Sequence, residues 1–308
     1  YYTKPHSEAQ LAFETAMELR QQTAGLESID VARLLLSLGD NQRLLAHYSL
    51  AAEQLEQGEK ILGQLPGDRR DLIADALGKL GRVKVLQGEL VEARQVLQKA
   101  ADMQLELYGG KHIAYAQALN DLASVGFAEG KFSEVELLLR QSLKIRDGLS
   151  DSGQRLDPDY ATNVNNLGLA LFRQGKLDES EPLFRLAVSL RENIYLQAHP
   201  EQAQSLTNLG LLLVAKGESD PALIYLQQAL EIRLQIFGDK HMRVAQAHNN
   251  LGMLYLSQAR FSEALQRYLA ARPIIEDTLG AEHSAMGTLL SNMAHSNLEL
   301  GNIDLAQQ

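Results

Sequence analysis

Apolar residues recur at spacings of three and four along most of the chain, and short glycine-containing stretches interrupt them. The stretch 206–246 shows this pattern most completely: one apolar-rich segment runs to Lys216 and Gly217, and a second runs from Ala222 to Phe237. Such spacing is typical of amphipathic helices, and glycines commonly separate them. We therefore predict a helix A, a tight turn, a helix B and a loop.

The same unit recurs along the sequence at a nearly fixed period. A leucine or methionine of helix A, together with the turn residue eight positions later, marks each copy. These pairs are Leu80 and Gly88, Leu122 and Gly130, Leu167 and Gly175, Leu209 and Gly217, Leu251 and Ala259, and Met293 and Gly301. The steps between copies are 42, 45, 42, 42 and 42 residues. A period in this range predicts an all-α solenoid, in which each antiparallel helix pair packs against its neighbours.

The period also divides the chain. We predict a regular array over 67–308, with five full repeats and a truncated sixth, and N-terminal helices over 1–66. Within 1–66 we expect an amphipathic helix at 7–23 and a degenerate repeat at 28–65, with a helix ending at Gly39 and another from about 42 to 57. The three extra residues in 150–158 should lengthen a loop, and Pro273 should kink helix B or end it early.

Composition narrows the class of protein. The net charge of −10 and pI near 5.3 argue against nucleic-acid binding, which needs a basic face. The absence of cysteine excludes disulfides and thiolate metal sites. No apolar run is long enough to cross a bilayer, so we expect a soluble, cytoplasmic chain without membrane insertion. Because the sequence begins without methionine, we expect it to be part of a longer protein.

The repeat resembles a known family. Its small and large positions in the third copy fit the tetratricopeptide signature: Leu167, Gly168, Leu171, Gly175, Leu177, Ser180, Phe184 and Ala187. The 42-residue length, the Asn-Asn-Leu start at 165–167 and 249–251, and the closing Gly-Asp-Lys-His or Ala-His-Pro resemble the kinesin-light-chain subtype. The resemblance covers about 69–308; the N-terminal part departs from it, as does Asp157, which replaces the loop histidine. It implies a right-handed superhelix whose A helices line a concave groove, in which relatives bind extended peptides or partner helices.

Amide side chains are the main candidates for ligand contacts. Asparagine precedes the marker residue of helix A in four copies, at Asn166, Asn208, Asn250 and Asn292, with Asp121 in the same column; Asn165 and Asn249 stand one position earlier. Asparagine is a poor residue for a helix interior, but its amide matches the C=O and N–H of one peptide unit. The column would therefore grip an extended backbone. Alternatively, the amides tie adjacent A helices together.

Apolar residues follow the asparagines on the same helical stripe. They are Leu169 and Phe172, Leu211 and Val214, and Met253 and Leu256. A groove floor of this kind would suit a peptide with spaced hydrophobic anchors. Burial against helix B or a neighbouring repeat is the other interpretation.

Two further columns of residues, arginines and histidines, are weaker candidates for a functional site. Arg146, Arg191 and Arg233 could face the groove, but we expect them to pair with carboxylates on a solvated face. His112, His199, His241 and His283 each occupy the same loop position, so they do not converge on a metal, and we predict loop or helix-capping roles. No phosphate loop, nucleophile elbow or zinc-protease motif occurs, so we expect neither catalysis nor a cofactor.

We therefore expect a scaffold that binds a protein or peptide ligand. One alternative is self-association through exposed repeat ends, which would give a homo-oligomer. Another is an accessory domain of a larger enzyme.

Overall fold

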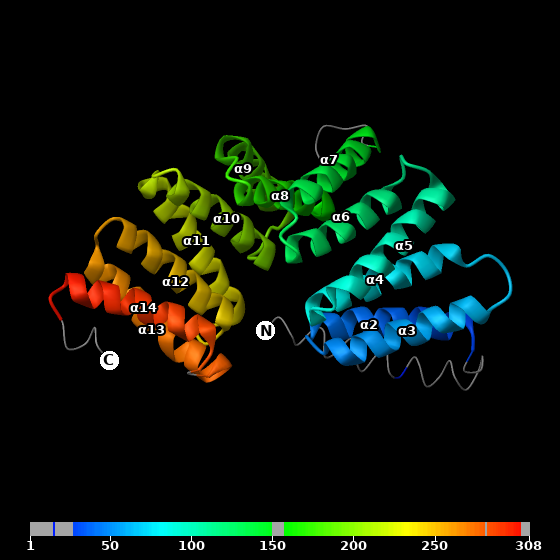
Figure 1. The fold of residues 1–308 in the computed structure, drawn as a ribbon, viewed down its shortest axis with the longest axis horizontal. Coiled ribbons are helices and arrows are strands. Elements are labelled where there is room, and N and C mark those ends of the chain that lie inside the picture. The colour runs from blue at the N-terminus through cyan, green and yellow to red at the C-terminus, as the bar shows by residue number, and fades with distance from the viewer. Residues whose placement is uncertain (1–14, 16–26, 150–156, 281, 303–308) are drawn as a thin grey trace. The chain divides into compact units, whose positions relative to one another are not determined.

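The computed structural model describes residue 15 and residues 27–149, 157–280 and 282–302, and all regular elements in these residues are α-helices (Figure 1). The predicted helix at 7–23 lies, apart from residue 15, outside the described residues. The helices are α2 (Ile29–Leu44), α3 (Tyr48–Gln64), α4 (Arg70–Gln87), α5 (Leu90–Tyr108), α6 (Ile113–Ala128), α7 (Phe132–Leu149), α8 (Pro158–Arg173), α9 (Leu177–Ile194), α10 (Pro200–Ala215), α11 (Ser219–Phe237), α12 (Met242–Ser257), α13 (Phe261–Leu279) and α14 (Ser284–Glu299). The all-α solenoid prediction is confirmed.

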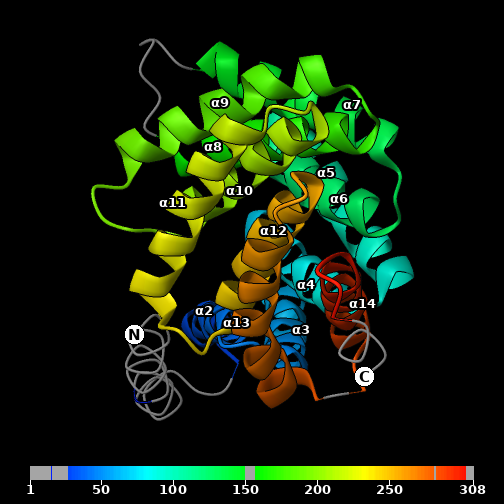
Figure 2. The ribbon, with the colours of Figure 1, turned by 90° about the vertical axis from the view of Figure 1, so that its left-hand side faces the viewer.

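The helices belong to two units, which we describe separately. Unit 1 extends to Gln174 and contains the antiparallel pairs α2/α3, α4/α5 and α6/α7, followed by α8. Unit 2 begins at Gly175 and contains α9, the pairs α10/α11 and α12/α13, and α14. Within each unit, helix B of one pair packs against helix A of the next, as α13 does against α14. Figure 2 shows these helices from another side.

Helix A of each pair contacts helix A of the next pair in the same unit. We call these helices the A row: α2, α4, α6 and α8 in unit 1, and α10, α12 and α14 in unit 2. Among the described helices of each unit, successive B helices make no comparable contact. Successive A helices therefore lie closer together than successive B helices, as on the inner side of a curved helix stack.

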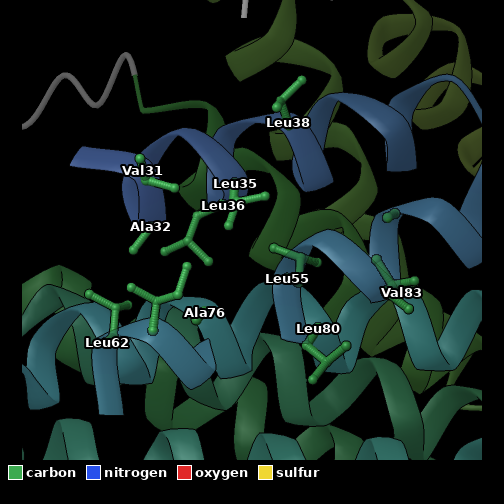
Figure 3. Packing of buried hydrophobic residues seen from close by; sticks show 13 residues of the cluster. Val31, Ala32, Leu35, Leu36, Leu38, Leu55, Leu62, Ala76, Leu80 and Val83 are labelled. Carbon is green, nitrogen blue, oxygen red and sulfur yellow. The ribbon is translucent and has the colours of Figure 1, made fainter. Parts of the chain in front are cut away.

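The core lies between the helices of each pair and extends to the next pair. Figure 3 shows one cluster, in which Leu35 and Leu36 of α2 meet Leu55 of α3 and Leu80 of α4. A glycine in helix A, such as Gly210 of α10, allows helix A and helix B to approach closely. A Cβ at Gly210 would lie 2.7 Å from Leu226 Cγ, too close for an ordinary contact. The repeating glycine of helix A is therefore a packing requirement.

The N-terminal repeat corrects the predicted helix ends. Helix α2 continues past Gly39 to Leu44, and α3 begins at Tyr48. The turn residue is Ala46, which has φ 62° in the left-handed region where glycine is usual. Gly39 instead packs against Leu55, whose Cγ would lie 2.6 Å from an added Cβ. The turn was misplaced because this repeat has alanine where the others have glycine.

Pro273 does not end its helix, so the predicted early end is wrong. Helix α13 continues to Leu279. Proline removes a hydrogen bond to the carbonyl four residues earlier, which belongs to Leu269, a residue that is 50% exposed. Ile274 and Ile275 are buried directly after the proline and hold the helix against its neighbours.

The one 45-residue interval between repeats has its extra residues between two helices, as predicted. Helix α7 ends at Leu149 and α8 begins at Pro158, with residues 150–156 outside the described part. In the part of the chain that is described, no helix has both the length and the apolar content needed to cross a membrane.

Candidate functional site

The four asparagines of the predicted column lie on the A row. Asn166 is on α8 of unit 1, and Asn208, Asn250 and Asn292 are on α10, α12 and α14 of unit 2. Because α10 contacts α12 and α12 contacts α14, the asparagines of unit 2 occupy equivalent positions on neighbouring helices. Asn208 is buried, whereas the other three are half-buried. Equal register therefore does not give equal exposure.

Hydrogen bonding distinguishes the asparagines further. Asn208 Oδ1 accepts a bond of 2.9 Å from Gln204 Nε2, and Asn166 Oδ1 accepts one of 3.4 Å from Asn165 Nδ2. The side-chain amides of Asn250 and Asn292 bond to no other group in the described part of the chain; only the backbone carbonyl of Asn292 accepts a side-chain bond. The amides of Asn250 and Asn292 therefore have their donors and acceptors available for a ligand.

A glutamine stands one helical turn before the column residue in three repeats. The pairs are Gln117 and Asp121, Gln204 and Asn208, and Gln246 and Asn250. Gln117 Nε2 donates to Asp121 Oδ1 at 3.1 Å, which reproduces the bond between Gln204 and Asn208. Residues four apart share a helix face, so the A row carries two adjacent columns of polar groups. The glutamines were not among the predicted contact residues, although their constant distance from the asparagine column was a signal.

Asp121 gives the column a structural role in unit 1. Its Oδ2 accepts a bond of 3.0 Å from Arg82 Nη1 of α4, and Arg82 Nη2 lies 3.9 Å from Asp40 Oδ1 of α2. Burial raises the pKa of Asp121, while the Arg82 charge and the bond from Gln117 oppose this rise. At this position the column residue connects adjacent A helices, as the alternative interpretation of the column expected.

The predicted apolar contact residues are all at least partly accessible. They are Leu169 and Phe172 on α8, Leu211 and Val214 on α10, and Met253 and Leu256 on α12. Met253 is 46% exposed, and the remaining five are half-buried. Asn249 Nδ2 lies 3.6 Å from Met253 Sδ, whereas Asn165 is buried. These side chains therefore combine apolar surface and amides on the same helices.

The arginine column is buried, so the expectation of a solvated face was wrong. Arg146 of α7 donates to Asp157 Oδ2 at 2.8 Å and to Gln117 Oε1 at 2.9 Å. Arg191 of α9 donates to the Glu201 carbonyl at 2.8 Å and to Ser205 Oγ at 2.6 Å.

Arg233 of α11 follows the same pattern, donating to the Arg243 carbonyl and to Thr207 Oγ1, both at 3.1 Å. Burial lowers the pKa of Arg191, and burial together with the Arg243 charge lowers that of Arg233 to about 10. These arginines join the end of helix B to the next helix A.

The loop histidines cap helices, as predicted. Nδ1 of His112, His199, His241 and His283 each accepts a bond from the backbone N–H two residues later. Asp157 replaces the histidine before α8, and its Oδ1 accepts the bond in the same way. Three of the rings stack on the aromatic residue four positions earlier, with centroids 3.7 to 4.4 Å apart. In the described ranges, no three histidine, aspartate or glutamate side chains gather to hold a metal ion.

Comparison with known proteins agrees with this geometry. A family model described as tetratricopeptide repeat matches residues 72–147, 159–235, 224–277 and 243–308. No curated protein matches the sequence.

Solved structures share the fold at low sequence identity. BtubC (BKLC) from P. vanneervenii is 22% identical with a TM-score of 0.59, over 72% of this chain and 87% of that one. A putative kinesin light chain with nearly identical TPR-like repeats, from Podosopora anserina, is 21% identical with a TM-score of 0.54, over 68% and 99%. The Rap conjugation gene regulator of plasmid pLS20, in complex with the Phr* peptide, is 17% identical with a TM-score of 0.63, over 91% and 72%.

Proposed function

Because the chain belongs to the tetratricopeptide repeat family, we propose that it binds an extended peptide segment of a partner protein along the A row. The observation that carries the proposal is the pair of uncommitted amides at Asn250 and Asn292, on the contacting helices α12 and α14. Each amide can donate one hydrogen bond to a peptide C=O and accept one from a peptide N–H. This arrangement recognises a backbone without reading its sequence.

Neighbouring side chains supply apolar contact for the same ligand. Met253 lies three residues after Asn250, on the same face of α12, and is nearly half exposed. Leu211 takes the equivalent position on α10 and is half-buried. Amides beside apolar surface suit a peptide whose backbone is bonded and whose spaced hydrophobic side chains are buried. The Rap regulator was solved with a peptide bound, which supports peptide binding as a function of this fold.

The test uses the two uncommitted amides. Peptides selected against the wild-type chain from a random library would be titrated into Asn250→Ala, Asn292→Ala and the double variant by fluorescence anisotropy. Each lost bond should cost about 0.5–1.5 kcal/mol, and the double variant loses four, so it should bind at least about 30-fold more weakly. Alanine is the better helix former, so the melting temperature should stay or rise.

A matched control separates this loss from a general effect of removing an asparagine. Asn193 is exposed on α9, a B helix of the same unit, and donates only within its own helix, to the Ser189 carbonyl at 2.8 Å. Asn193→Ala should leave the affinity unchanged. N-methylation of single peptide bonds in the ligand adds a second test. If a peptide N–H bonds to Asn250, methylating that nitrogen should weaken binding to the wild-type chain but should not weaken binding to Asn250→Ala any further. Unchanged affinity of the double variant, with a lower melting temperature, would show that the amides only stabilise the fold.

A further inference from the structure

A small cleft in unit 1 has no counterpart in the function proposed so far. It lies between α4, α5 and α6 and has a volume of about 130 Å³. Its walls include the small residues Ala74, Gly78, Ala100, Ala114 and Ala118. The position of Gly78 is taken by asparagine, threonine or serine in the following repeats. The missing side chain at Gly78 therefore helps to open this cleft.

Hydrogen-bond acceptors from three helices line the cleft. Gln104 of α5 is nine-tenths buried, and its Oε1 has no hydrogen-bond partner. Asp121 of α6 is also nine-tenths buried; its two oxygens accept bonds from Gln117 and Arg82. A carboxylate has about four acceptor positions, so Asp121 retains capacity for a further donor. Asp75 of α4 adds a half-exposed carboxylate, paired with Lys79 at 2.7 Å.

The positive charge in the cleft is already shared. Arg82 faces Asp121 at 3.0 Å and Asp40 at 3.9 Å, and Asp40 also pairs with Arg43. Nε of Arg82 is buried without a partner, so the cleft also contains one donor next to its acceptors. A buried acceptor without a partner, such as Gln104 Oε1, is costly and indicates a group that completes it. The carboxylates of Asp121 and Asp75 also line the cleft, so the group that completes Gln104 Oε1 is one that donates.

We propose that the cleft receives the cationic end of a lysine or arginine side chain of a peptide bound along the A row of unit 1. The inference rests on the proposed peptide-binding function and adds the chemistry of one ligand residue. An ammonium or guanidinium group brings several donors and no acceptor, which matches Gln104, Asp121 and Asp75. Burial raises the pKa of Asp121, and a ligand cation would offset the cost of keeping that carboxylate ionised. The net charge of −10 favours the approach of a basic peptide.

The test compares two probes of the same shape. N-acetyl-lysine methylamide carries the charge, and N-acetyl-norleucine methylamide has the same aliphatic stem without it. Titrations would follow the side-chain amide signals of Gln104 and Gln117 by nuclear magnetic resonance. The lysine probe should shift these signals at concentrations at which the norleucine probe does not. Equal shifts with both probes, or none with the lysine probe, would overturn the proposal.

Variants place the binding in the cleft. Gly78→Leu should fill it, because a Cβ at Gly78 meets only Asp121 Oδ2, at an ordinary 3.5 Å. The melting temperature of the variant would show that the fold is kept. Gly63→Leu is the matched control, since Gly63 lies in α3 with no atom within 4 Å of an added Cβ. Gly78→Leu should lower the affinity for the lysine probe at least tenfold. Gln104→Leu, which removes the free acceptor, should lower it by a similar factor. Gly63→Leu should not.

Failure of this proposal is distinguishable from failure of the proposed function. The Asn250→Ala and Asn292→Ala changes lie in unit 2 and should leave binding of the lysine probe unaltered. Selected peptides that bind through these asparagines, together with a lysine probe that shifts no signal of Gln104 or Gln117, would refute the cleft alone. Selected peptides whose affinity falls in Gly78→Leu should lose at least tenfold in affinity when their lysine is replaced by norleucine.

Discussion

Acidification should weaken the joint before α10, because His199 caps that helix only when its ring is neutral. Nδ1 of His199 accepts a bond of 3.3 Å from the Glu201 N–H, and protonation would remove the lone pair that accepts it. Gln202 Oε1 accepts from the His199 N–H at 2.9 Å and completes a capping box. The ring stacks on Tyr195 with centroids 3.7 Å apart.

The direction of the effect follows from the pKa of His199 in the folded chain. Burial lowers this pKa below the ordinary 6.5; Glu201 opposes the shift and Arg191 adds to it. Below about pH 6.5 the unfolded chain therefore binds more protons than the folded chain. The stability that the neutral ring contributes is complete above about pH 6.5 and is lost as the pH falls through the folded pKa. A helix N-cap contributes about 0.5–2 kcal/mol, which bounds the loss.

His199→Asn provides the matched comparison, because asparagine caps helices well and does not titrate in this range. Amide hydrogen exchange at the start of α10 would be measured in both proteins from about pH 7.5 to about pH 5. Comparing them at equal pH cancels the intrinsic pH dependence of exchange. Protection of the wild-type protein should fall relative to the variant by a factor that corresponds to about 1 kcal/mol. Parallel pH profiles in the two proteins would refute the reasoning.

Two further predictions concern the turn at Ala259 and the buried Arg233. Ala259→Gly should raise the urea midpoint of unit 2, because Ala259 is held at φ 56° and relief of about 1–2 kcal/mol exceeds glycine's larger unfolded-state entropy; Ala215→Gly, in a helical conformation at the end of α10, should lower it. Arg233→Met should lower the midpoint by the equivalent of about 1–3 kcal/mol, since it leaves Thr207 Oγ1 and the Arg243 carbonyl without their donor. A midpoint that stays or rises in Arg233→Met would mean that the cost of burying the guanidinium outweighs these bonds.

Local sequence determined the helices and their caps. The 42-residue period fixes which residues face each other, because helix geometry converts spacing into a face. The histidines were correctly predicted as caps, because a capping residue acts on N–H groups two or three positions away. The one misplaced turn, near Gly39, shows the limit of a local signal: glycine serves both turns and close helix packing, and only the contact with Leu55 distinguishes them.

Tertiary packing decided what each repeated column does. Arg146, Arg191 and Arg233 were assigned to a solvated face because spacing indicates a direction but not what covers it. The same limit applies to the asparagines: Asn208 is buried and bonded to Gln204, whereas Asn250, at the same position of the repeat, has a free amide. Side chains from adjacent helices set burial and partners, and the hydrogen-bond partners of the three arginines lie 10 to 29 residues away in sequence. The sequence alone therefore determined the register of the candidate site, and the packing of neighbouring repeats decided which of its groups remain available to a ligand.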